Sequence, residues 1–107
     1  MSDDIKPFPE VDRIVHEPAR LAIMTVLTSC RSADFLFLQN ITGLSKVNLS
    51  VQISRLEESG LLSVEKTIEK KKMRTRISLT GQGVEVMDRY WKTMEQIRKQ
   101  SRSTAKR

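Results

Sequence analysis

The side chains best suited to chemistry are amides and bases in the middle of the chain, and their types favour binding over catalysis. The amides of Asn48 or Gln52 could pair with adenine N6 and N7, and Lys46 or Arg55 could contact guanine or a phosphate. Three consecutive lysines at 70–72 provide charges that suit backbone phosphates. This region therefore predicts contact with nucleic acid.

Residues that support catalysis or metal binding are scarce. His16 and Cys30 are the only histidine and cysteine, so neither a His/Cys metal cluster nor an intramolecular disulfide can form. No nucleophile elbow or phosphate loop occurs, and the Gly-x-Gly at 81–83 stands alone. We expect no enzyme activity, no metal and no cofactor.

The charge of the chain favours an anionic partner. Its 107 residues hold 19 Lys and Arg against 13 Asp and Glu, a net charge of +6. Residues 46–76 carry +4 and residues 98–107 carry +5, so the rest is slightly acidic. The sequence lacks an apolar run of about 18 residues and an apolar signal segment. We expect a cytoplasmic protein with no membrane partner.

Apolar periodicity predicts three helices in the first 60 residues. The first lies within 14–30, with Pro18 in its first turn, and Asp12 could cap a short turn before it. The second follows Ser32 or Asp34 and ends at Gly43, and Ser45 is the expected N-cap of the third. Their apolar stripes are Leu21, Met24 and Leu27; Phe35, Leu38 and Ile41; and Leu49, Ile53 and Leu56.

Alternating residues predict a β-hairpin over 62–79. Ile68 and Met73 fall on the side expected to face inward, and Arg74 and Arg76 fall on the outer side, where one could pair with Glu65 or Glu69. The tip at 69–72 has no Gly, Asn or Pro and matches no tight two-residue turn, so a long, mobile loop is expected.

Thr80 is the expected cap of a last helix that runs to about Gln100. Such a helix is about 30 Å long and would project beyond a small domain, so its apolar side needs another surface. A second subunit is the simplest choice, although packing within one subunit is the alternative. The predicted dimer interface is Val84, Met87, Tyr90, Trp91, Met94 and Ile97.

Two short helices joined by a turn that contains Gly43, followed by a basic hairpin, are typical of a helix-turn-helix domain. The sequence resembles winged-helix transcriptional regulators of the MarR/ArsR-like kind. The motifs that carry the resemblance are Arg20-Leu21-Ala22-Ile23, Phe35-x-x-Leu38, Thr42-Gly43-Leu44-Ser45, Asn48-Leu49-Ser50, Leu56-Glu57-Glu58-Ser59-Gly60-Leu61-Leu62, Glu65-Lys66, Arg74-Thr75-Arg76 and Leu79-Thr80-x-x-Gly83.

The resemblance covers about 12–88 and implies a dimer that binds duplex DNA, with residues 46–55 as recognition helix and 62–79 as wing. Val51 and Gln52 stand where many relatives have Arg and His, so base preference stays open. The fold class predicted is mainly α with a small β-hairpin. Its parts are an extended arm (1–11), a winged-helix domain (12–80), a dimerisation helix (81–100) and a disordered basic tail (101–107).

We predict a homodimeric, sequence-specific transcriptional regulator that binds double-stranded DNA, with the recognition helix in the major groove and the basic wing on the phosphate backbone or in the minor groove. A small-molecule effector is left open. Alternatives are a module that docks an acidic protein and, lower in rank, RNA binding. The predicted recognition-helix contacts are Ser45, Lys46, Asn48, Ser50, Val51, Gln52 and Arg55. The predicted wing contacts are Lys70, Lys71, Lys72, Arg74 and Arg76.

Overall fold

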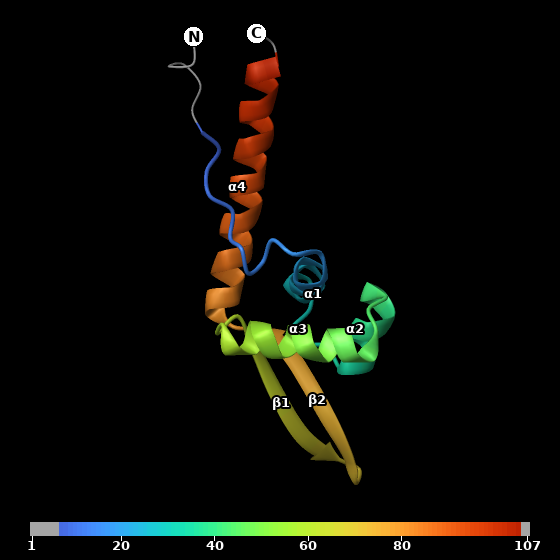
Figure 1. Cartoon of the computed structure of the whole chain (residues 1–107). Helices are drawn as coiled ribbons and strands as arrows, with labels where there is room; N and C mark the ends of the chain where they lie inside the picture. The colour runs from blue at the N-terminus through green and yellow to red at the C-terminus, as the bar shows by residue number, and fades with distance from the viewer. Residues whose placement is uncertain (1–6, 106–107) are drawn as a thin grey trace.

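The computed structural model describes residues 7–105, with side chains to residue 103. The elements are α1 (Pro18–Thr28), α2 (Phe35–Thr42), α3 (Lys46–Glu58), β1 (Leu62–Glu69), β2 (Lys72–Leu79) and α4 (Gly81–Ala105). Figure 1 shows α1–α3 gathered in a body, from which the hairpin projects one way and α4 the other. The molecule therefore measures 67 × 25 × 21 Å. This arrangement confirms the predicted winged-helix fold class.

Short polar side chains begin the helices where the sequence predicts. Asp34 Oδ1 accepts from the Phe37 amide at 2.7 Å, and Ser45 Oγ accepts from the Asn48 amide at 3.1 Å. Thr80 Oγ1 accepts from the Gly83 amide at 3.0 Å. Gly43 ends α2 in the left-handed region, at φ 72°. These caps determine the residues at which α2, α3 and α4 begin.

The start of α1 confirms the prediction and adds the residue that caps the helix. Asp12 Oδ1 accepts from the Ile14 and Val15 amides, both at 2.9 Å, so the expected short turn forms before the helix. Glu17, just before Pro18, then caps α1 by accepting from the amides of Ala19 and Arg20. The helix accordingly begins at Pro18, which lies in its first turn as predicted.

One apolar core joins the body of α1–α3, the base of the hairpin and the first turns of α4. Ile23, Leu38, Leu49, Leu56 and Ile77 are each completely buried. The Ala33 and Ile77 backbones exchange two 2.8 Å hydrogen bonds, which fasten the base of β2 to the segment before α2. The base of the hairpin is thus held to the helical body, and only its outer part projects.

The tip of the hairpin is a tight turn, so the predicted long loop is wrong. Glu69 pairs with Lys72, which leaves only Lys70 and Lys71 between the strands. Their φ angles are 50° and 65°, the left-handed values that a two-residue type I′ turn requires at both positions. Lysine rarely adopts this conformation, which is why the sequence pattern pointed elsewhere. The twist of the eight paired positions favours this turn.

The predicted inward side of the hairpin is only partly buried. Ile77 is buried, but Ile68 and Met73, which pair across the strands, are 74% and 64% exposed. Both residues lie on the predicted side of the strands, but the outer half of the hairpin extends past the body (Figure 1), and no other described segment covers them there.

Helix α4 continues to Ala105, five residues beyond the predicted end at Gln100. The expected disordered tail at 101–107 is therefore wrong over 101–105, and residues 106 and 107 lie outside the described part. Arg102 in the last turn places a cation near the helix C-terminus, which the helix dipole favours. The arm at residues 7–11 forms neither helix nor strand and runs beside α4 (Figure 1), and residues 1–6 of the predicted arm lie outside the described part.

Candidate nucleic-acid interface

Helix α3 is anchored to the body along one side, which leaves the other side exposed. Leu49, Ile53 and Leu56 are 6% exposed or less. Lys46, Ser50 and Arg55, all predicted contacts, lie on exposed parts of the helix. Ser45 is exposed too, although its hydroxyl is used as the N-cap. Helix α3 and the hairpin both lie at the end of the molecule away from the α4 C-terminus (Figure 1).

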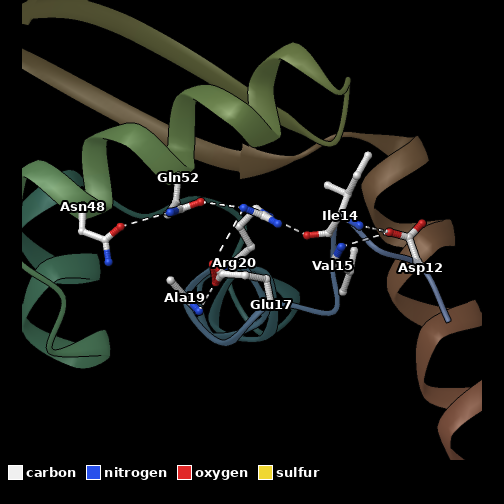
Figure 2. Close-up of polar contacts among 8 residues, drawn as sticks. All are labelled: Asp12, Ile14, Val15, Glu17, Ala19, Arg20, Asn48 and Gln52. Carbon is white, nitrogen blue, oxygen red and sulfur yellow. Dashed lines mark hydrogen bonds and ion pairs between the residues drawn. The ribbon is translucent and has the colours of Figure 1, made fainter.

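The two amides predicted to read bases are instead joined in a polar network with α1. Arg20 Nη1 donates to Gln52 Oε1 at 2.9 Å, and Gln52 Nε2 donates to Asn48 Oδ1 at 3.0 Å. Figure 2 shows this chain of contacts running from α3 to the start of α1. Gln52 follows the buried Leu49 by three residues, so it lies beside the anchored stripe and not opposite it. The amide of Gln52 is therefore directed at α1.

Arg20 is the residue that connects this network to the chain before α1. Its side chain is 14% exposed, its Nε donates to the Ile14 carbonyl at 2.5 Å, and its Nη1 lies 3.8 Å from Glu17 Oε2. One guanidinium thus contacts α3, the α1 cap and the preceding turn (Figure 2). The sequence indicates Arg20 only as part of a family motif, because nothing in its spacing shows which helix it contacts.

Valines occupy the most exposed part of α3. Val47 is 74% exposed and Val51 is 45% exposed, and their i, i+4 spacing puts them on one side. Val51 was a predicted contact, whereas Val47 was missed. The sequence signal that could have indicated Val47 is its i, i+4 spacing from Val51 on an otherwise polar side of the helix. An open hollow of about 460 Å³ beside them is lined by Phe35, Lys46, Val47, Ser50 and Val51.

The hairpin presents a concentrated group of cations. Lys70, Lys71, Lys72 and Arg74 are all exposed. Arg76 is exposed as well, but its Nη2 lies 3.1 Å from Glu69 Oε1, as the predicted cross-strand pairing allowed. The charge available at the tip therefore comes mainly from the three lysines and Arg74.

The predicted dimer side of α4 divides into two groups. Met87 and Tyr90 are 1% and 3% exposed and belong to the core of the same chain, so their assignment to an intersubunit surface is corrected. Met94 and Ile97 are half-buried. Val84 and Trp91 are 55% and 47% exposed and line an open hollow of about 450 Å³ together with Leu27 and Leu79.

The described residues hold no group of three or more His, Cys, Asp or Glu side chains that could bind a metal ion. Within the same residues, no helix combines the length and apolar character needed to cross a bilayer. His16 contacts Tyr90, with 2.9 Å between Nδ1 and Oη, and so joins the segment before α1 to α4.

Sequence comparison gives the family. Residues 19–98 match the model of the winged helix DNA-binding domain. The chain belongs to this family. A transcriptional regulator homologue from Pyrococcus horikoshii OT3 is 31% identical, with a TM-score of 0.76 over 80% of this chain and 85% of that one. No curated protein matches the chain.

Structural neighbours include regulators of the MarR family. One from Enterococcus faecalis V583 is 17% identical, with a TM-score of 0.73 over 88% of this chain and 84% of that one. BpsR of Bordetella bronchiseptica, whose DNA binding is regulated by 6-hydroxynicotinic acid, is 17% identical, with a TM-score of 0.70 over 83% of this chain and 67% of that one. At this identity they share the winged-helix fold. Family and neighbours together support a DNA-binding transcription regulator of a generally non-enzymatic fold.

Proposed function

We propose that this winged-helix protein is a homodimer that regulates transcription by binding a specific double-stranded site. The observation that carries the proposal is that α3, which is exposed along one side, and the hairpin, whose tip holds three exposed lysines, lie at the same end of the molecule, away from the C-terminus of α4 (Figure 1). In this arrangement α3 enters the major groove, and Lys70, Lys71 and Lys72 contact phosphates beside it. Base contacts then give specificity, and phosphate contacts give register and most of the salt dependence.

The dimer is proposed from the uncovered side of α4. Val84 and Trp91 are seven residues apart on one side of the helix and remain about half exposed or more in the single chain. Trp is enriched among the residues that dominate protein interfaces. A two-fold pair of subunits would place two α3 helices about 34 Å apart, one turn of duplex, and would favour a palindromic site.

Selection of bound duplexes from a random pool tests both parts of this proposal. We expect a two-fold symmetric consensus with half-sites one helical turn apart. The affinity for that consensus should fall as salt rises, and the logarithm of the association constant should fall by several units for each tenfold increase in salt concentration. A slope near zero, or no enriched sequence, would contradict the proposal. Nuclease-resistant capture of an acidic protein, with no duplex binding, would favour the docking-module alternative.

A further inference from the structure

We propose that α3 recognises thymine through Val47 and Val51, which contact the C5-methyl groups in the major groove. The amides of Asn48 and Gln52 serve to position the helix against α1. This inference rests on the proposed DNA binding and adds the chemistry by which the site is read.

The exposed valines are poorly explained by the stability of α3. β-Branched residues lose side-chain freedom in a helix, so Ala, Lys or Glu would favour the helix more at both positions. Val47 and Val51 nevertheless stand one turn apart on the exposed side, at 74% and 45% exposure. They are separated by about 6 Å along the helix axis, close to two base-pair steps of about 3.4 Å.

The network with Arg20 disfavours the usual readout of adenine by these amides. A bidentate contact to adenine uses both the oxygen and the nitrogen of one amide. Gln52 already uses its Oε1 for Arg20 and its Nε2 for Asn48, and Asn48 uses its Oδ1 for Gln52. A bidentate contact to adenine would require Gln52 to turn its amide away from Arg20, and it would require Asn48 to share its Oδ1 with Gln52.

Thymine is the base that suits the remaining surface. Its C5-methyl group is the apolar feature by which unmodified bases differ in the major groove, and apolar side chains recognise it. The hollow beside the valines is also lined by Lys46, which can meet a phosphate, and by Ser50, whose hydroxyl can pair with several base edges. The polar groups beside the valines thus tolerate different bases, and the methyl contacts supply the discrimination.

Deoxyuridine tests the inference because it lacks only the methyl group and keeps the same base pairing. The selected duplex is compared with duplexes in which single thymines are replaced by deoxyuridine, at constant salt. We expect dissociation constants about fourfold higher for each contacted methyl group, the value for one buried carbon. The double variant Val47→Ala, Val51→Ala should bind thymine and deoxyuridine duplexes equally well.

Leu36→Ala is the matched control, because Leu36 is 64% exposed and lies on α2 instead of α3. It should retain the full thymine preference of the unmodified protein. Salt-dependent duplex binding with equal affinity for thymine and deoxyuridine would overturn this inference alone. A methyl preference that persists in the double valine variant would overturn it as well. Failure to bind any duplex would instead contradict the proposed function.

Discussion

The two basic ends of the molecule hold their charge in different ways. At the hairpin end, Lys70, Lys71 and Lys72 lie at the tip of two paired strands whose base is fastened to the body by the Ala33–Ile77 hydrogen bonds. At the other end, Arg98, Lys99 and Arg102 lie on the part of α4 that projects beyond the body (Figure 1).

The two sets of cations also differ in their contacts with neighbouring side chains. Arg98 donates to both carboxylate oxygens of Glu95, at 3.1 and 2.7 Å. The lysines of the tip, by contrast, are all exposed, and they belong to the hairpin, which lies at the same end of the molecule as α3 (Figure 1). The proposed function therefore assigns DNA contact to the cations of the hairpin tip and not to those at the end of α4.

Removing the three tip lysines should have the largest effect. Replacement of Lys70, Lys71 and Lys72 by Ala removes about three phosphate contacts, so affinity at 0.15 M salt should fall by about 100-fold for all duplexes. The log–log salt slope should become shallower by about three units. Fluorescence anisotropy at several salt concentrations measures both.

The matched control is the pair Lys99→Ala, Arg102→Ala at the far end of α4. It should leave affinity and slope nearly unchanged, since these cations lie away from α3. An equal loss in both variants would show that the two ends bind DNA alike, and the distinction between them would be wrong.

Arg20→Ala should lower the free energy of unfolding by about 2 kcal/mol, because it leaves partners of a largely buried guanidinium unsatisfied. Denaturant unfolding measures this change. Arg13→Ala, which removes an exposed cation before α1, should change stability by less than about 0.5 kcal/mol. Equal stability of the two variants would contradict the role assigned to the α1–α3 network.

Trp91→Ala should weaken the proposed dimer by about tenfold or more, because truncation of a central interface Trp commonly costs more than 1 kcal/mol. Sedimentation over a range of concentrations gives the dimer dissociation constant. Arg89→Ala, an exposed change on the same helix, is the control. If the unmodified protein sediments as a monomer at high micromolar concentration, the exposed side of α4 is not a subunit interface.

Lys71→Gly should raise the free energy of unfolding by about 1 kcal/mol, because glycine adopts the left-handed conformation without the penalty that lysine has. Lys72→Gly removes the same charge from a strand position and should be destabilising. Thermal or denaturant unfolding compares the two. If neither variant is more stable than the unmodified protein, the two-residue turn is contradicted.

The smallest effect concerns pH at the α4 end. The hydrogen bonds from Arg98 hold the pKa of Glu95 below its ordinary value of 4.5. A lowered pKa means that this contribution to stability is present above the ordinary value and is lost as pH falls through the lowered one. Carboxyl NMR titration should show the lowered pKa, and Arg98→Gln should return it toward 4.5. An unchanged pKa in that variant would contradict the pairing.

Local chemistry was enough to predict the order of elements. Asp34, Ser45 and Thr80 were recognised as caps, and Gly43 as a helix end, because each depends on neighbours within a few residues. The spacing of Leu49, Ile53 and Leu56 likewise predicted the anchored side of α3. The accumulation of positive charge in residues 46–76 could also be located from the sequence.

Tertiary structure decided which side chains are available. Gln52 was predicted to face DNA, yet Arg20, 32 positions earlier, occupies its amide oxygen. Met87 and Tyr90 share a periodic stripe with Val84 and Trp91, and only packing against the body separates the buried pair from the exposed pair. The tight turn at Lys70 and Lys71 depends on the strand pairing around it. Periodicity and caps are set by neighbours in the chain, whereas burial and hydrogen-bond partners depend on residues that only folding brings together.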